Sequence, residues 1–278
     1  WRRRAGLESG VRELLVKAPS NAGPNPGKWW LERRIAARQA LSDGLHHDAY
    51  RIAAAHSQIP GSIGFAEGEW LAGWIALRFL HRNDEALAHF ERVPEGVVSF
   101  GQGCEGEPLL QTELLENSIR EMRKRTARGT INCNTNASLP STIERLREAG
   151  LDSIRVSINS ARQTYYHNYY RPRNYSFSDV KESIKAMKQN GGFVSLNYFI
   201  LPGFTDSMEE TSAFLELIEE TGPDFIQLRN LNIDPEWYLK EIGSTTALPS
   251  YTIRNWLEMI KQRFPALRFG YYNPCLNP

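Results

Sequence analysis

The sequence predicts a mixed fold in which N-terminal all-α helical hairpins, an α-solenoid fragment, are joined to an α/β partial TIM-type barrel. Composition changes abruptly near Val93-Pro94, because residues 1–93 hold 15 of the 23 alanines and 5 of the 7 tryptophans, whereas residues 94–278 hold 10 of the 11 tyrosines. The hydrophobic period changes from helical to strand-like at the same place. Beyond it, strand-like and helix-like segments alternate, which is typical of parallel β/α units. We therefore expect two domains, 1–93 and 94–278.

Charge and hydropathy exclude two classes of partner. The net charge is +1, with 13 basic and 10 acidic residues before the boundary and 20 basic and 22 acidic residues after it. Neither part has the basic excess of a nucleic-acid-binding protein, so we expect no nucleic-acid partner. No apolar run approaches the ~18 residues that a membrane span requires, so we expect no membrane span.

The first 93 residues show only helical periodicity. Four segments are expected to be amphipathic helices, namely 29–44, 47–61, 65–80 and 81–93. In the first of these, Leu31, Ile35 and Leu41 share one stripe, which we expect to face a core. In the third, Trp70 and Trp74 share a face, and their spacing favours a place in the core over a platform for sugar stacking. Short turns between the segments predict antiparallel hairpins of the kind that stack into a solenoid.

Five segments after the boundary read as strands, because they are short, apolar and rich in β-branched or aromatic residues. They are 96–103, 129–138, 151–160, 191–203 and 223–235. Helix-like segments alternate with them and carry Ser, Thr or Gly at their ends, at 109–125, 141–150, 176–191 and 207–222. Such repeats imply parallel strands with right-handed crossovers, whose carboxyl ends form the site.

The stretch "VSFGQGCEGEPLL", residues 98–110, has the form of a strand that ends in a ligand-contacting turn. From about Val98 onward the sequence resembles the core of a radical S-adenosylmethionine (SAM) enzyme. "CEGEP" resembles the Gly-Gly-Glu-Pro-type turn of that family. "NTNAS", "VSINS", "YRPRNYSF", "LPGFTD" and "LRNLNIDPE" follow in the order and spacing of its later strands. The resemblance implies SAM as a cofactor.

Seven residues are candidates for binding SAM in this resemblance, namely Gly106, Glu107, Asn134, Asn136, Ser157, Asn159 and Arg171. Gly106 and Glu107 would meet the amino group of SAM, and the alternative is that Glu107 caps the following helix. Asn134 and Asn136 alternate along their strand, and so do Ser157 and Asn159, so the members of each pair are expected to point the same way.

Ser157 and Asn159 fit contacts to the ribose of SAM best. Arg171 is the candidate for the SAM carboxylate, with packing on tyrosines at the surface as the alternative. Gln227, Arg229 and Asn230 end the fifth strand, where they are candidates for substrate contact.

A family of this kind also implies a [4Fe-4S] cluster, held by a Cys-x3-Cys-x2-Cys loop that precedes the "GEP" turn. The chain has three cysteines, Cys104, Cys133 and Cys275, and they do not form this spacing. Alanine- and tryptophan-rich helices stand where the loop is expected. We therefore expect no cluster ligands and no catalytic residue here, and SAM binding that is weak at most.

Residues 1–93 resemble part of the superhelical scaffold domain of soluble lytic transglycosylases, in "WWLERRIAARQAL", "AYRIAAAH" and "EWLAGWIALRFL". That resemblance implies contact with peptidoglycan or protein through residues 1–93, although no partner is specified. The catalytic glutamate of that family lies in a separate lysozyme-like domain. The helical half implies the periplasm and the barrel half implies the cytoplasm.

Three functional hypotheses follow. The first is a chimera of two fragments without intact catalytic activity. The second is a radical SAM enzyme whose cluster is supplied by another subunit or by unusual ligands. The third is a periplasmic scaffold that binds peptidoglycan or protein. The disagreement between the two halves about compartment favours the first hypothesis.

Overall fold

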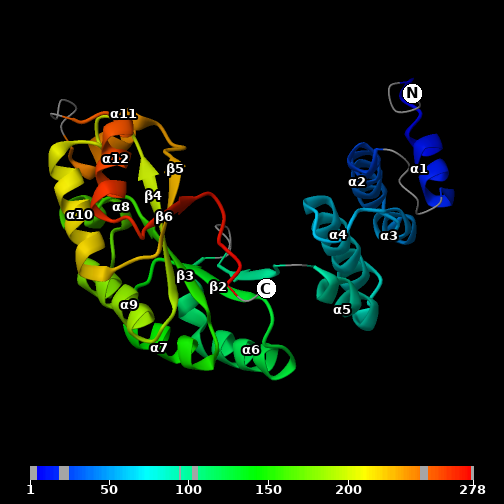
Figure 1. The fold of residues 1–278 in the computed structure, drawn as a ribbon, viewed down its shortest axis with the longest axis horizontal. Helices are drawn as coiled ribbons and strands as arrows, with labels where there is room; N and C mark the ends of the chain where they lie inside the picture. The colour runs from blue at the N-terminus through cyan, green and yellow to red at the C-terminus, as the bar shows by residue number, and fades with distance from the viewer. Residues whose placement is uncertain (1–4, 19–24, 94, 102–105, 245–249, 277–278) are drawn as a thin grey trace. The chain divides into compact units, whose positions relative to one another are not determined.

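The computed structural model describes residues 5–18, 25–93, 95–101, 106–244 and 250–276. It divides into two compact units, Trp1–Gly96 and Val97–Pro278, and each has a hydrophobic core of its own (Figure 1). The predicted mixture of helices with a parallel sheet is confirmed. Pro94, at the predicted boundary, lies outside the described residues.

The first unit is helical throughout its described part. Its helices are α1 (Glu8–Lys17), α2 (Pro26–Ser42), α3 (His46–Ala54), α4 (Ile63–Phe79) and α5 (Asn83–Arg92). Four of them, α2 to α5, correspond to the segments that were predicted to be helical, whereas α1 was not predicted. Gly73 lets α5 approach α4 closely, since a β-carbon at this position would lie 2.8 Å from the ring of Phe90.

Of the three residues on the predicted stripe of α2, only Leu41 packs against the core. Leu31 and Ile35 are 43% and 40% exposed, and the helix turns Trp30, Ala37 and Ala40 into the core instead. Alanine has little bulk and loses no side-chain entropy in a helix, so alanine faces allow neighbouring helices to pack closely. The alanine-rich composition of this unit therefore marks its core more reliably than its large apolar residues do.

The prediction that places Trp70 and Trp74 in the core is confirmed only for Trp74, which packs against the core. Trp70 is 51% exposed and stacks on Trp74 with 5.9 Å between ring centroids, so it does not belong to the core. His56 is buried and lies 3.2 Å from Glu69, which also contacts His89. Burial alone would raise the pKa of Glu69, but the hydrogen bonds with His89 and His56 outweigh burial and lower it.

The second unit is built on a six-stranded parallel sheet in which the strands follow in chain order. They are β1 (Val97–Phe100), β2 (Thr130–Thr135), β3 (Ser153–Ile158), β4 (Phe193–Ile200), β5 (Phe225–Asn230) and β6 (Arg268–Gly270). The five predicted strands are confirmed. β6 was missed because three residues are too few to show a period. Among the described residues the sheet is open, because β1 pairs there only with β2 and β6 only with β5.

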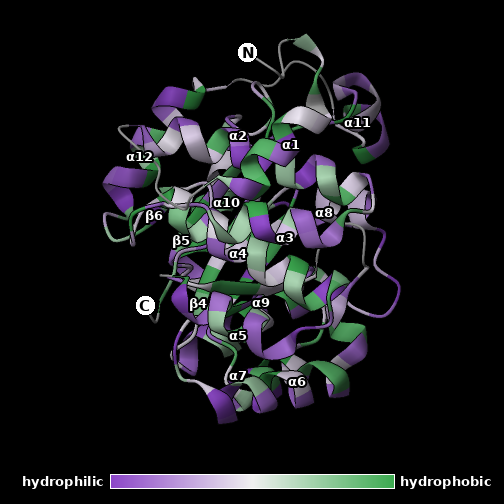
Figure 2. Ribbon diagram, turned by 90° about the vertical axis from the view of Figure 1, so that its right-hand side faces the viewer, coloured by the Kyte–Doolittle hydropathy of each residue, from purple (hydrophilic) through white to green (hydrophobic). Residues whose placement is uncertain are grey.

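Helices follow most strands of this sheet. They are the 3₁₀ helix η2 (Pro108–Gln111), then α6 (Thr112–Arg125), α7 (Pro140–Ala149), α8 (Gln163–Tyr170), α9 (Phe177–Gln189), α10 (Met208–Thr221), α11 (Pro235–Ile242) and α12 (Ile253–Arg263). The four predicted helices correspond to α6, α7, α9 and α10. α8, α11 and α12 were missed. The helices carry hydrophilic and hydrophobic residues together, as amphipathic helices on a core do (Figure 2).

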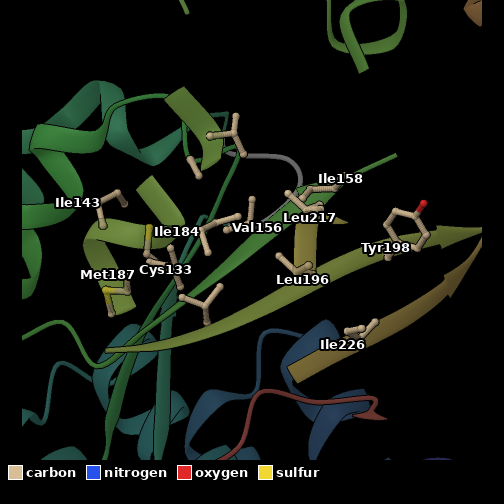
Figure 3. Close-up of a cluster of buried hydrophobic side chains, with 14 of the residues drawn as sticks. Cys133, Ile143, Val156, Ile158, Ile184, Met187, Leu196, Tyr198, Leu217 and Ile226 are labelled. Atoms are coloured by element: carbon tan, nitrogen blue, oxygen red, sulfur yellow. The ribbon is translucent and has the colours of Figure 1, made fainter. Parts of the chain in front are cut away.

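Strand alternation gives the sheet two different faces. Ile154, Val156 and Ile158 of β3 join the core with residues of α6, α7, α9, α10 and α12 (Figure 3). The intervening residues, Ser153, Arg155 and Ser157, must point to the opposite side. We call that side the inner face. Its polar residues are Ser99, Thr130, Asn132, Asn134, Ser153, Arg155, Ser157, Ser195, Asn197, Gln227, Arg229 and Arg268.

The chain after β6 lies against the inner face of β5 and then reaches the amino end of β2. The Arg229 guanidinium lies over the ring of Tyr271 at 4.8 Å, and Asn273 accepts a hydrogen bond from Gln227 in the middle of β5 at 2.6 Å. The backbone N–H of Leu276 donates to Thr130 at the start of β2 at 2.6 Å. In a parallel β/α sheet the carboxyl ends of the strands are the side that offers the binding residues.

Candidate functional site

The turn after β1 depends on a close backbone approach. Gly101 has φ +75°, and a β-carbon there would lie 2.1 Å from the backbone oxygen of Asn134 in β2. Gly106 also has a positive φ, of +82°, but no described atom lies within 4 Å of the position of its β-carbon. Gly101 therefore fixes the end of β1 against β2, whereas the described residues leave room beside Gly106.

Glu107 lies at the start of η2, and its carboxylate is used within the chain. One oxygen accepts from the backbone N–H of Leu109 at 3.2 Å and from the hydroxyl of Thr135, and the other accepts from the N–H of Asn136 at 2.8 Å. Glu107 thus caps the helix that follows it, as the alternative interpretation of this residue predicted. The carboxylate joins the turn after β1 to the end of β2.

Asn134 and Asn136 differ in their surroundings. The side-chain oxygen of Asn134 accepts from Asn132 at 3.0 Å on the inner face. Asn136 lies beyond the last residue of β2, and its side-chain oxygen accepts from the backbone N–H of Ser138 at 3.0 Å. Strand alternation therefore does not relate the directions of these two side chains.

Ser157 and Asn159 are also separated by the end of their strand. Ser157 lies on the inner face and accepts from Asn197 of β4 at 3.4 Å. Asn159 follows β3 and is 1% exposed; its amide donates to the backbone oxygen of Tyr165 and to the hydroxyl of Tyr238, each at 3.2 Å. The side-chain oxygen of Asn159 is buried without a partner among the described residues. A hydroxyl of a ligand is one donor that would satisfy it.

Arg171 ends α8 in a left-handed conformation, with φ 49°. Its guanidinium pairs with Glu241 of α11 at 2.7 Å, and its side chain is 72% exposed. It lines a surface hollow with His167 of α8, Glu241 of α11 and Tyr175, which lies between α8 and α9. Arg171 is thus in contact with α11, and none of the contacts within the described part of the chain joins it to Ser157 or Gly106.

A buried carboxyl group supports the turn after β3. Glu210 of α10 is fully buried and accepts from the hydroxyl of Ser160 at 2.7 Å, from the N–H of Ala161 at 2.6 Å and from the hydroxyl of Tyr198. Burial raises the pKa of Glu210, although these three donors act in the opposite direction. The contact fixes the residues that follow Asn159.

Sequence reasoning missed Arg155 and Asn197 on the inner face. Arg155 donates to Gln227 across β4 at 3.4 Å. The alternation of polar and apolar residues in "SIRVSI" and "FVSLNYFI" is the signal that could have identified both. None of the residues that these six strands place on the inner face is an aspartate or glutamate.

The described cysteines do not fit a [4Fe-4S] cluster. Cys133 is 0% exposed in the core on the helix-covered side of the sheet, and burial raises the pKa of its thiol. Cys275 lies beside Thr130 at 3.8 Å, at the amino end of β2. Cys104 lies outside the described residues. In the part of the chain that is described, no three metal-ligating side chains gather.

No helix in the described segments is both long and apolar enough to cross a membrane.

Comparison with known proteins supplies the remaining observation. The family model of the radical SAM superfamily matches residues 80–218. Among solved structures, the chain is similar to a domain of pyruvate-formate lyase-activating enzyme from Bacteroides vulgatus ATCC 8482, with 15% identity and a TM-score of 0.46, covering 63% of this chain and 99% of that one.

Two further solved structures have similar scores. Methylornithine synthase is 15% identical with a TM-score of 0.44, covering 62% of this chain and 49% of that one. The FeFe-hydrogenase maturase HydG from Carboxydothermus hydrogenoformans is 14% identical with a TM-score of 0.45, covering 97% of this chain and 71% of that one. The chain thus spans about half the length of methylornithine synthase.

Proposed function

The chain belongs to the radical SAM superfamily, and on that premise we propose that its second unit binds SAM weakly and has no catalytic activity of its own. The placement of the cysteines is the observation that supports this proposal most strongly. Cys133 lies in the helix-covered core and Cys275 at the amino end of β2, so these two thiols do not meet at the carboxyl ends of the strands. A cluster needs several thiolates on one short loop. Any cluster would therefore have to come from another subunit or from unusual ligands, which is the enzyme alternative.

The SAM contacts belong to the carboxyl ends of the strands. The room that the described residues leave beside Gly106 would admit the amino end of SAM. The unpartnered oxygen of Asn159 would accept from a ribose hydroxyl, with Ser157 beside it on the inner face. Asn134 and Asn136 would border the same end of the sheet. Glu107 would act by holding the turn, because its carboxylate is already bonded.

Arg171 is the candidate for the carboxylate of SAM, and it would have to exchange its ion pair with Glu241 for that contact. Exposed ion pairs are worth only about 0–1 kcal/mol, so the exchange costs little. An arginine also presents two parallel donors to a carboxylate.

The first unit is, in this proposal, a fragment similar to the helical scaffold of soluble lytic transglycosylases, joined to the barrel near Val93-Pro94 as a chimera. The half-exposed Trp70 stacked on Trp74 supports the scaffold alternative, in which this unit contacts peptidoglycan or protein. Stacked exposed aromatic rings suit the apolar faces of sugars.

Calorimetry of SAM binding tests the proposal. We expect the purified chain to bind SAM with a Kd of roughly 1 mM or weaker, because the contribution of an iron ligand is missing and each ~1.4 kcal/mol is tenfold in Kd. Arg171→Gln should weaken this binding about tenfold, since it removes a charge-assisted contact. Arg173→Gln, which changes an exposed arginine two residues away, is the matched control and should leave it unchanged.

Two results would overturn the proposal. SAM binding in the micromolar range with iron bound after anaerobic reconstitution would favour the enzyme alternative. Equal binding by the Arg171→Gln and Arg173→Gln variants would remove Arg171 from the site.

A further inference from the structure

The inner face carries two arginines. Arg155 lies in the middle of β3 and Arg229 near the carboxyl end of β5, both on the face turned away from the helices. Ser195 of β4 is paired with Arg155 in the register of the sheet, and Arg229 is paired with Phe199, four residues further along β4. Because serine is small, the Arg155 side chain can reach over β4 to Gln227, to which it donates at 3.4 Å.

Neither arginine has an acidic partner among the described residues. The hydrogen bond to Gln227 leaves Nε of Arg155 without a partner. The Arg229 guanidinium lies over the ring of Tyr271 at 4.8 Å. Both side chains are half-buried.

The helix-covered side of the same unit is different. Arg123 pairs with Asp152, and Lys188 pairs with Asp224 at 2.6 Å. Both of these partly buried cations have a carboxylate partner. The strand residues of the inner face include no acid that could serve Arg155 or Arg229 in the same way.

Two uncompensated positive charges in a half-buried site cost free energy. Burial, and after it the charge of Arg229, lower the pKa of Arg155, so the surroundings of Arg155 disfavour its cation. A buried charge is normally paired with an opposite charge. An anion from outside the chain would supply that charge.

The neighbouring polar groups are neutral. Ser157 and Asn197 lie on the inner face next to Arg155, and the Asn197 amide donates to the Ser157 hydroxyl at 3.4 Å. The side-chain oxygen of Asn197 has no partner among the described residues. Rotation of this amide by 180° would present its N–H₂ group in place of the oxygen, which adds a neutral donor next to the two arginines.

We propose that the inner face binds an oxyanion, the carboxylate or phosphate group of a small molecule, between Arg155 and Arg229 with Asn197 beside them. Arginine presents a planar fork of donors that matches both of these groups. This inference deepens the proposed function. It rests on the proposed function in one respect, namely that SAM has its own site and the anion therefore belongs to a second ligand. It names that ligand as an anionic molecule.

Thermal unfolding in the presence of simple anions tests the inference. The full chain is melted in sodium phosphate, in sodium acetate and in sodium chloride of matched ionic strength. We expect phosphate, acetate or both, at about tenfold over Kd, to raise the midpoint by about 3 °C above chloride. Phosphate alone would identify a phosphorylated ligand, and acetate alone a carboxylic acid.

Three variants locate the effect. Arg155→Gln and Arg229→Gln should each lose most of the rise, and neither should lower the midpoint in chloride, because each removes one of two repelling charges. An arginine with a purely structural role would lower the midpoint in chloride. Arg254→Gln changes an arginine whose side chain is 87% exposed on α12 and should behave as the unchanged protein.

The inference is overturned if phosphate and acetate do not raise the unfolding midpoint of the unchanged protein above its value in chloride. It is also overturned if Arg155→Gln and Arg229→Gln retain the full increase in midpoint. SAM affinity, measured on the same variants, separates this result from the proposed function. A loss of SAM affinity in Arg155→Gln would assign the site to the carboxylate of SAM itself and would contradict a second ligand.

Discussion

Glu210→Ala is expected to destabilise the second unit by about 3–5 kcal/mol, the range measured when one partner of a buried charged or hydrogen-bonded group is removed. The alanine would leave the hydroxyls of Ser160 and Tyr198 and the N–H of Ala161 buried without an acceptor. It would also leave a cavity beside Tyr198, whose ring stacks on Phe214 at 4.1 Å. The measurement is chemical denaturation followed by circular dichroism.

Glu209→Ala is the matched control for this experiment. Glu209 is the preceding residue of α10, its side chain is 63% exposed, and it pairs with Arg162 at the surface. A surface pair contributes about 0–1 kcal/mol, so the control should lose no more than that. Similar losses in the two variants would show that Glu210 does not hold the turn after β3.

Gly101→Ala is expected to cost about 3 kcal/mol or more. A β-carbon at φ +75° is strained by about 1–2 kcal/mol. It would also lie 2.1 Å from the backbone oxygen of Asn134, which cannot move without shifting the end of β2. Backbone strain and a backbone clash together place this substitution among the most damaging ones.

Gly106→Ala has nearly the same backbone angle, with φ +82°, but no described atom near the added carbon. Only the strain remains, so we expect a loss of about 1 kcal/mol. Denaturation midpoints of the two variants, measured side by side, separate the clash from the strain. A loss in Gly106→Ala as large as that in Gly101→Ala would contradict the close approach of the two strands.

The main architecture of the second unit could be predicted because its signals are local. Parallel strands buried on one side show as short apolar runs, and Ser or Gly residues mark helix ends, as Ser176 and Gly150 do. α8 lacked such a signal, because its run of tyrosines has neither a clear stripe nor a cap. β6 is held by its pairing with β5, which no pattern of three residues can reveal.

The candidate site could be predicted only in part. The position of Asn159 shows why: β3 ends at Ile158, so the alternation that should align Asn159 with Ser157 stops one residue too early. Element boundaries are what sequence patterns locate least well. The bonds of Glu107 to Thr135 and Asn136, and of Arg171 to Glu241, join residues far apart in the chain, and sequence patterns carry no information on such contacts.

We propose that this chain has no radical SAM catalysis of its own, and an assay for 5'-deoxyadenosine, the product of reductive SAM cleavage, decides between this proposal and the enzyme alternative. The purified chain is reconstituted anaerobically with iron and sulfide and incubated with SAM and dithionite, and the nucleoside is quantified by chromatography. We predict no 5'-deoxyadenosine above a control without protein. Repeated turnover to 5'-deoxyadenosine by the purified chain would contradict this account and identify the chain as an enzyme.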